Sequence, residues 1–460
     1  MVLWTRLSGA ELPPEVPVAW ELADDEAFTR IVARGVEPAL AADAHSVHAE
    51  PAGLQPARWY WYRFMALGQR SGVGRTRTAP AADAVVQGLD FAIASCQRYD
   101  VGHYAAWQHA AAESLDLLIF LGDYIYEYAS SRQALRAHVG GPVVQLDDYR
   151  ARYAQYKSDP ALQAAHAACP WLVVWDDHEV ENDYAGASGQ RLQPDFAARR
   201  AAVYQAWWEH MPLPKAVRPL DGAMRIYGHL DWGRLARLHL LDDRQYRDLQ
   251  ACPRPGLEDS NTVRRADCAA LMDPRRSLLG QQQEDWLAGN WSLDRPWNLL
   301  AQQTLMARFA TQDPAGRGGG RYWTDGWDGY APARNRLLGV VADQQVPGVV
   351  VLGGDRHANY VADLKADFDD PRSAVVATEF CGTSISSLGP AQQRVDAALP
   401  FNPHLHWGRS DQRGYVRFAL RAQALQVKLQ VVADARDAHS ALATAARFVV
   451  QARRPGAERA

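Results

Sequence analysis

The sequence carries little net charge and has no long apolar run. Its 460 residues have a formal net charge of −4, which gives neither a basic surface for nucleic acid nor an acidic tail. No stretch approaches the roughly 18 uninterrupted apolar residues of a transmembrane helix. With 48% hydrophobic and 22% charged residues, the composition is that of an ordinary globular protein with a sizeable core. The length alone allows one large domain or two to three smaller ones.

Cysteine is also scarce, and its odd count excludes a dense disulfide framework. The five cysteines are Cys96, Cys169, Cys252, Cys268 and Cys381. Cys252 and Cys268 enclose a polar stretch typical of a surface loop. A disulfide bond closing this loop is a hypothesis that requires an oxidising compartment. Cys169 and Cys381 are expected to be structural.

The sequence shows no basic, apolar and small-residue pattern of a signal peptide at its start, where VLWTRL already has the pattern of a strand. Two interpretations stay open. Either the protein is cytoplasmic, or the chain begins after a leader that is removed or missing.

Residues 1 to about 83 predict an all-β unit, because short segments with strand-like patterns are separated by Pro, Gly and Asp. The stretch GQRSGVGRTRTAPAADA then predicts a turn and a linker, which places a domain boundary near residue 84. From residue 84 to 460, apolar strand-like runs alternate with helical patterns such as YAAWQHAAAES. This alternation indicates an α/β domain with strands buried between helices.

Several of the predicted strands end in side chains that can bind metal. In open α/β sheets, active sites form where loops leave the carboxyl ends of strands. A single Gly-Asp after a strand is also a common turn, but four such ends are hard to explain as turns. Several carboxylates close together would repel one another and take up protons unless cations neutralise them. The strand-end residues are Cys96, Asp123, Asp177 with His178, and Asp355 with His357.

The ligand types restrict the metals. A thiolate and the phenolate of Tyr126 suit a Lewis-acidic ion such as Fe(III), whereas carboxylates suit Ca²⁺, Mg²⁺ or Mn²⁺. Asp123 can bridge two ions, and Tyr126 can turn back onto one of them. Such a site most naturally hydrolyses phosphate esters, since one metal lowers the pKa of a water that attacks phosphorus and another neutralises the phosphoryl oxygens. His178 is the candidate for donating a hydrogen bond or a proton to the leaving group.

Together these motifs resemble the PhoD-like phosphatases (alkaline phosphatase D), a branch of the calcineurin-like metallophosphoesterases, over nearly the whole chain. The resemblance implies a mixed-sheet metallophosphoesterase sandwich at residues 84–460 and an immunoglobulin- or fibronectin-like β-sandwich at residues 1–83. The matching stretches are FAIASCQRYDVGHYAAW, LIFLGDYIYEY, VVWDDHEVENDY, LDDRQYRD, WDGYAPARNRLL, VVLGGDRHANY, EFCGTSIS and DQRGYVRF.

The resemblance also implies how the ligands are used. A ferric ion would be held by Cys96, Asp123, Tyr126 and His357. Asp123 would bridge to a calcium site that also uses Asp177 and Asp355, other divalent metals being alternatives. His178 takes the position of the histidine in the superfamily's Asn-His-(Asp/Glu) motif. Further candidates for calcium or outer contacts are Asp176, Asn182 and Glu379.

The resemblance implies partners and a location as well. The substrate would be a small phosphate mono- or diester, and a monomer is the expected state. Members of the family are typically exported through twin-arginine signals, so a periplasmic or secreted protein with a missing start is one expectation and a cytoplasmic variant the other.

Arg356, His404 and His406 are further candidates for binding phosphate. Asp242, Asp243 and Arg244 are expected to form a hydrogen-bonded corner.

Three other functions compete with this interpretation. A phospholipase D-type phosphodiesterase would use the same centre. A non-catalytic binding protein with a degenerate phosphoesterase domain would lack at least one strand-end ligand, and here all six and His178 are present. A metal-dependent peptidase is disfavoured because no His-Glu-x-x-His motif occurs.

Overall fold

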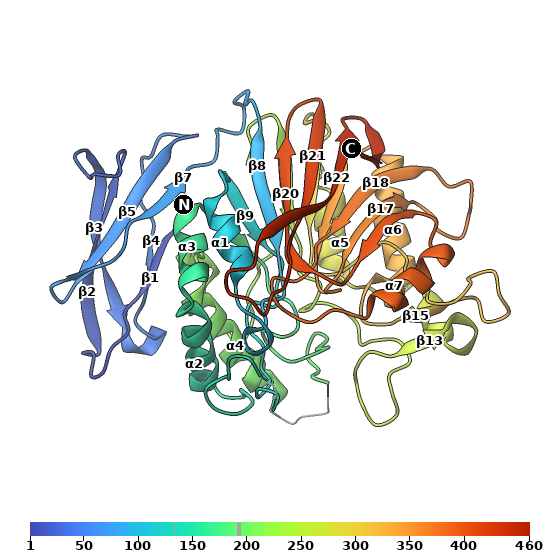
Figure 1. The fold of residues 1–460 in the computed structure, drawn as a ribbon, viewed down its shortest axis with the longest axis horizontal. Helices are drawn as coiled ribbons and strands as arrows, with labels where there is room; N and C mark the ends of the chain where they lie inside the picture. The colour runs from blue at the N-terminus through green and yellow to red at the C-terminus, as the bar shows by residue number, and fades with distance from the viewer. Residues whose placement is uncertain (133, 191–194) are drawn as a thin grey trace.

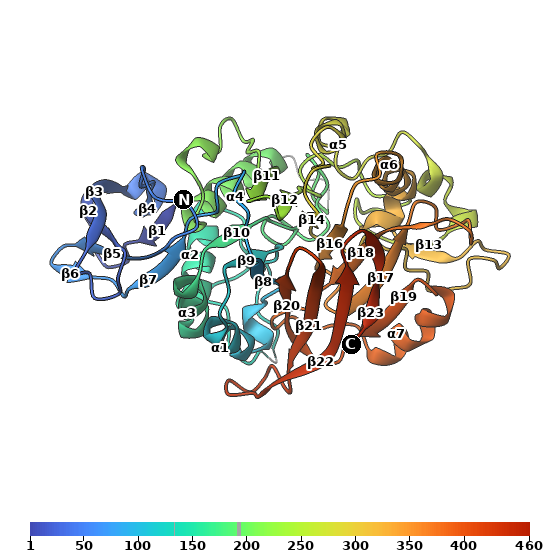
Figure 2. The ribbon, with the colours of Figure 1, turned by 90° about the horizontal axis from the view of Figure 1, so that it is seen from above.

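Two seven-stranded sheets form the centre of the molecule, and helices pack on part of their outer faces (Figures 1 and 2). The structure is a computed structural model that describes residues 1–132, 134–190 and 195–460. A core of apolar side chains from both sheets fills the space between them, and separate cores join each sheet to its helices. The fold is therefore mixed α/β, as the alternating pattern predicts.

The first sheet is mixed. Its β8, β9 and β10 strands are parallel neighbours, and the C-terminal strands continue it in antiparallel order. In spatial order the strands are β10 (Trp171–Val173), β9 (Leu117–Phe120), β8 (Leu89–Ala94), β20 (Arg413–Leu420), β21 (Ala424–Val432), β22 (Leu442–Gln451) and β23 (Arg454–Arg459).

The second sheet has four parallel neighbours, β12, β14, β16 and β18, flanked by antiparallel strands. In spatial order its strands are β11 (Gly228–Trp232), β12 (Ala236–Leu240), β14 (Trp297–Ala301), β16 (Val349–Gly353), β18 (Val375–Cys381), β17 (Asn359–Lys365) and β19 (Leu405–Arg409). A small pair, β13 (Thr262–Arg264) and β15 (Arg321–Trp323), lies apart from it.

The helices divide between the two outer faces. One set packs on β8–β10 and the other on the second sheet. The first set is α1 (Ala105–Ala112), α2 (Leu146–Lys157), α3 (Pro160–Ala168) and α4 (Phe196–His210); the second is α5 (Gln281–Ala288), α6 (Ala331–Asp343) and α7 (Gln392–Ala398). Among the described residues, none of the helices is long and apolar enough to cross a bilayer.

The first 77 residues form strands at one end of the molecule (Figure 1), and these strands have a core of their own. These strands are β3 (Ile31–Leu40), β2 (Glu15–Ala23), β5 (Trp59–Ala66) and β6 (Gln69–Arg70) in one sheet, β7 (Gly74–Arg77) paired to β5, and the pair β1 (Leu3–Arg6) with β4 (Ser46–Ala49). The part of the Gly-rich stretch predicted as a turn and linker therefore contains β6 and β7. Glycine suits β7 because a Cβ on Gly74 would lie 2.2 Å from the Tyr62 ring.

The strands that lead to the predicted site are buried on both faces. All four residues of β9 and all five of β16 are buried, and both are runs of apolar residues that favour strands between packed layers. Rigid buried strands hold the residues that follow them in fixed positions. The fold therefore supplies a firm base for any group at these strand ends.

The structure contains the hypothesised disulfide bond. Cys252 and Cys268 are joined, and Cys96, Cys169 and Cys381 are free and buried. The bond closes the segment next to a small apolar cluster that includes Leu271 and Tyr322. It therefore closes the loop between residues 252 and 268 beside this cluster.

Replacing both Cys252 and Cys268 by Ala is expected to lower the free energy of unfolding by about 3 kcal/mol, because a loop of about 15 residues loses its cross-link. Urea denaturation of the variant and the oxidised wild type measures this difference. Replacing the free, buried Cys169 by Ala is the control for loss of a sulfur atom alone. A double variant as stable as the oxidised wild type would show that the bond constrains nothing.

Candidate metal centre

The predicted site residues lie just beyond the carboxyl ends of four strands. Since β8, β9 and β10 are parallel neighbours and β16 lies in the facing sheet, their loops meet at one edge of the sandwich. Cys96 follows β8, Asp123 and Tyr126 follow β9, Asp177 and His178 follow β10, and Asp355 and His357 follow β16.

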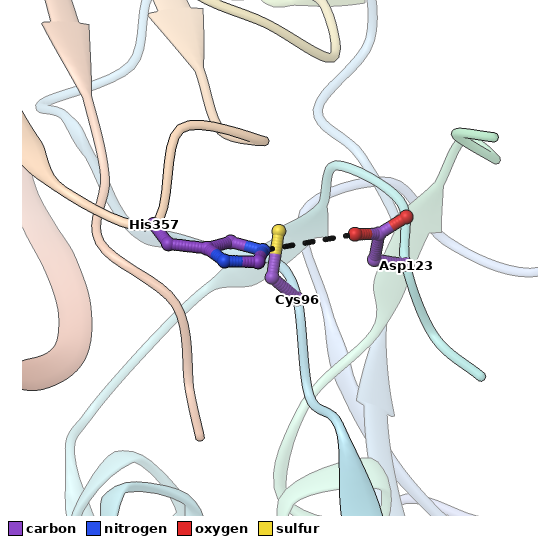
Figure 3. Close-up of side chains that lie close together, drawn as sticks. All are labelled: Cys96, Asp123 and His357. Atoms are coloured by element: carbon purple, nitrogen blue, oxygen red, sulfur yellow. Dashed lines mark ion pairs between the residues drawn. The ribbon is translucent and has the colours of Figure 1, made fainter. Parts of the chain in front are cut away.

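Cys96, Asp123 and His357 form one compact group. Each offers a ligand atom within 4.8 Å of the others, and Figure 3 shows the three side chains converging from separate loops. His357 Nε2 lies 4.0 Å from Asp123 Oδ2. Tyr126 donates its hydroxyl to the same carboxylate oxygen at 2.7 Å and lies 3.2 Å from His357 Nε2. His357 Nδ1 donates to the Leu388 carbonyl, which leaves Nε2 for a ligand.

Two further groups continue from the first. The second group contains Asp123, Asp177 and His178, each of which offers a ligand atom within 4.8 Å of the others. The third group contains Asp176, Asp177 and Asp355, whose ligand atoms lie within the same distance of one another. Asp123 belongs to the first two groups and Asp177 to the last two. The centre is therefore an extended cluster in which shared carboxylates connect neighbouring positions.

The backbone at these strand ends is strained. Cys96, Asp123, Asp355 and His357 have φ of 58°, 59°, 60° and 51°, in the left-handed region that side-chain-bearing residues rarely adopt. Such strain concentrates at functional sites. Gly122, with φ of 103°, permits the close approach of the β9 loop to β10, because a Cβ there would lie 2.4 Å from Asp176 Cβ.

The buried carboxylates present oxygen atoms that accept no hydrogen bond from the protein. Among the described residues, Asp123 Oδ1, Asp176 Oδ2 and Asp177 Oδ1 are buried without a hydrogen bond. An unsatisfied buried polar atom costs about 1–3 kcal/mol, and a charged one more. Cations bound here would satisfy these oxygens, so the residues fit a metal centre.

The charge balance leads to the same conclusion. In the protein without cations, burial raises the pKa of Glu179 to about 8 and that of Asp355 to about 6. Burial raises the pKa of Asp176 well above its usual value, although Arg244 opposes this. Burial and the Asp123 carboxylate raise the pKa of the Cys96 thiol. Cations would remove the repulsion that favours these protonated forms.

His178 has a partner that the sequence patterns did not reveal. Its Nδ1 donates to Glu127 Oε2 at 2.8 Å, and Glu127 Oε1 accepts the Asn182 backbone N–H at 2.9 Å. The imidazole ring also lies 4.3 Å from the Tyr126 ring, centroid to centroid. Burial opposes a charge on the ring, but the carboxylates of Glu127, Asp123 and Asp177 raise the pKa of His178 well above its usual value.

Glu179 is a second residue that the sequence analysis missed. Its carboxylate is fully buried and accepts three backbone N–H groups, those of Asp123 (3.0 Å), Tyr124 (2.6 Å) and Asp176 (2.8 Å). It thereby joins the β9 loop to the β10 loop. Its position one residue after His178 was the only available sign, because nothing in the sequence shows which amides it meets.

Arg244 balances part of the negative charge. Its guanidinium is buried and donates to Asp176 Oδ1 at 2.5 Å and Asp325 Oδ2 at 2.8 Å, and it lies 3.5 Å from Asp177 Oδ1. The expected corner does exist, since the Arg244 and Gln245 backbone N–H groups both donate to Asp242 Oδ1. The corner therefore also holds an arginine against the candidate ligands.

Of the remaining candidates, three lie outside the centre and one lies beside it. Glu379 accepts the backbone N–H groups of Met306 and Ala307 at 2.7 Å and belongs to none of the three groups. His404 bonds to the Arg308 carbonyl, and His406 pairs with Asp363, so neither belongs to the centre. Arg356 remains next to it, between Asp355 and His357. Its guanidinium lies 4.3 Å from the Trp323 ring centroid.

Comparisons with known proteins agree with this geometry. The profile of the PhoD-like phosphatase matches residues 91–429, and that of the PhoD-like phosphatase N-terminal domain matches residues 1–80. The chain belongs to the PhoD-like phosphatase family. Alkaline phosphatase D of Bacillus subtilis (strain 168) is 42% identical over 469 residues, which cover 98% of this chain and 78% of that protein.

A solved structure of PhoD has the same fold. It superposes with a TM-score of 0.94 at 41% identity and covers 100% of this chain and 89% of its own. Membership of the PhoD-like phosphatases makes the chain a phosphoric ester hydrolase whose reaction depends on bound metal. The sequence-based prediction of family and activity is confirmed.

Replacing Glu179 by Gln is expected to lower the affinity for metal about tenfold to hundredfold. The side-chain NH₂ of Gln would face a backbone N–H group that donates to a carboxylate oxygen of Glu179 in the wild type, and two donors cannot bond to each other. Chelator competition followed by elemental analysis measures the affinity. The control is Glu209→Gln, because Glu209 is a buried glutamate that pairs with Arg150 outside the centre. Equal metal affinity in the Glu179 variant and the wild type would contradict the positioning role.

Proposed function

We propose that the centre holds an iron ion and a calcium ion that share Asp123. The observation that carries this is the donor set, which changes along the cluster from thiol, phenol and imidazole to carboxylates alone. Iron suits the first end and calcium the second. The proposed iron ligands are Cys96, Asp123, Tyr126 and His357, and the proposed calcium ligands are Asp123, Asp177 and Asp355.

Bound cations at such a centre supply a low-pKa water as nucleophile and neutralise the oxygens on phosphorus. The protein's own groups do the rest. Glu127 fixes the His178 ring through Nδ1, which leaves Nε2 to face a substrate beside Asp123 and Asp177. We assign His178 the catalytic role of donating a hydrogen bond or a proton to the leaving oxygen.

Arg356 is the proposed contact for a non-bridging phosphate oxygen. Its side chain is half-buried, stacks on Trp323 and has no ion pair among the described residues. Arg98, by contrast, is neutralised by Asp100 at 2.6 Å and lies 5.6 Å from the Tyr128 ring centroid. Two arginine–aromatic pairs next to the centre fit a phosphodiester, whose second organic group can lie against the aromatic rings.

We also propose a domain division, a location and an oligomeric state. We assign residues 1–83 to an immunoglobulin-like N-terminal domain and residues 84–460 to the catalytic domain. The Cys252–Cys268 bond supports a periplasmic or secreted protein, since such bonds persist in oxidising compartments. A monomer suffices, because one chain supplies every group of the centre.

Replacing Asp123 by Ala is expected to abolish phosphate release and to reduce bound iron, because the shared ligand is lost. Elemental analysis and assays with bis-p-nitrophenyl phosphate and p-nitrophenyl phosphate measure both effects. Asp231→Ala is the control, since Asp231 pairs with Arg237 on β11 and β12 away from the centre. An Asp123 variant with near wild-type activity would overturn the shared-ligand assignment.

Replacing His178 by Ala is expected to lower kcat about 10²- to 10⁴-fold while the metal content stays unchanged. Glu127→Gln is expected to give a smaller loss, because the ring remains but is less firmly oriented. Steady-state kinetics combined with elemental analysis distinguishes the roles. Loss of metal from the His178 variant would make His178 a ligand instead of an acid.

Replacing Arg356 by Ala is expected to raise KM more than it lowers kcat, because the proposed contact binds the phosphate throughout the reaction. Arg98→Ala serves as the comparison, since its charge is already paired with Asp100. An unchanged kcat/KM for both the mono- and the diester would remove Arg356 from the substrate site.

A further inference from the structure

A cavity lies away from the metal centre, between the N-terminal strands and helices α2 and α3. Its volume is about 680 Å³, within the range of small-molecule sites. None of the candidate metal ligands lines it. The residues that matter for its chemistry are Trp4, Arg6, Tyr62, Phe64, Lys157 and His166.

Lys157 is the most unusual group in this cavity. It is the last residue of α2 and one of four lysines in the chain. Its Nζ lies 4.3 Å from the Trp4 ring centroid and 5.0 Å from that of Tyr124. No carboxylate pairs with it among the described residues, whereas Lys215 pairs with Glu37 at 2.7 Å. Burial and the nearby charge of Arg6 lower the pKa of Lys157 to about 7.

Arg6 is the second cation. Its Nε donates to the Ala44 carbonyl at 3.0 Å, and in the described part of the chain its guanidinium forms no ion pair. The negative charge of Glu209 raises the pKa of Arg6, but Glu209 is already paired with Arg150 at 2.6 Å. Two sheltered cations that repel each other make an environment that favours an anion.

The aromatic side chains that line the cavity are firmly held. Trp4 Nε1 donates to the Glu209 carbonyl at 3.1 Å, which fixes the indole on α4. The His166 ring stacks on Trp171 at 3.8 Å and bonds to Tyr124 Oη at 2.8 Å. Tyr62 and Phe64 meet edge to face at 6.0 Å. An apolar wall with a few polar groups is the usual form of a ligand site.

We propose that this cavity binds a small organic anion with an apolar body, such as an aromatic carboxylate. Lys157 and Arg6 hold the anionic end, and the rings of Trp4, Tyr62 and Phe64 enclose the body. The site is separate from the metal centre and its occupant is not a substrate of the hydrolase.

Isothermal titration calorimetry with 2-naphthoate tests the proposal on the metal-loaded full chain. Saturable binding is expected, with at least tenfold weaker affinity in Lys157→Met and in Arg6→Met. Lys428→Met, a half-buried lysine on β21, and Asp123→Ala are expected to bind as the wild type does. The neutral 2-naphthalenemethanol is expected to bind at least tenfold more weakly than the carboxylate. Hydrolysis by Lys157→Met is expected to be unchanged.

A spectrum of protein labelled with ¹³C-lysine locates the ligand, because only four lysine signals occur. 2-Naphthoate is expected to shift the Lys157 signal and leave the other three lysine signals in place. Because this measurement uses the wild-type chain, it tests the proposed site even if Lys157→Met does not fold. Absence of saturable binding, equal binding of the neutral alcohol, or loss of binding in Asp123→Ala alone would overturn the proposal.

Discussion

The crowding of buried carboxylates at one edge of the sandwich is the constraint on which the rest of the site depends. Asp123, Asp176 and Asp177 meet there with the half-buried Asp355 and with Cys96, and the Arg244 guanidinium pairs with only part of these carboxylates. Without further positive charge, burial and mutual repulsion favour protonated carboxyls. Bound cations remove this cost, so the arrangement makes physical sense as a metal centre.

The fold supplies the force that holds the groups together. Fully buried strands β9 and β16 end at the centre, and strained left-handed residues follow them. Glu179 then joins two of the loops through three backbone amides. The stability of the two sheets thus maintains a local conformation that would be unfavourable in isolation.

The sequence revealed the groups that chemistry requires but only some of those that position them. Apolar runs ending in Cys96, Asp123, Asp177 and Asp355 were visible because strand ends are local patterns. Most partners of Glu127, Glu179 and Arg244 lie more than 50 residues away in the chain, and a single sequence does not show such pairings. The short strands β6 and β7 lie in the stretch that the sequence predicts as a turn and linker, because Gly74 contributes no side-chain pattern, although the Tyr62 ring requires its small size.

The most direct measurement is X-ray diffraction from crystals of the metal-loaded protein, with anomalous data on both sides of the iron edge. An iron peak is expected within coordination distance of Cys96, Asp123, Tyr126 and His357, and a second cation peak without iron signal is expected beside Asp177 and Asp355. Metal-loaded crystals with no cation density among these side chains would contradict this expectation.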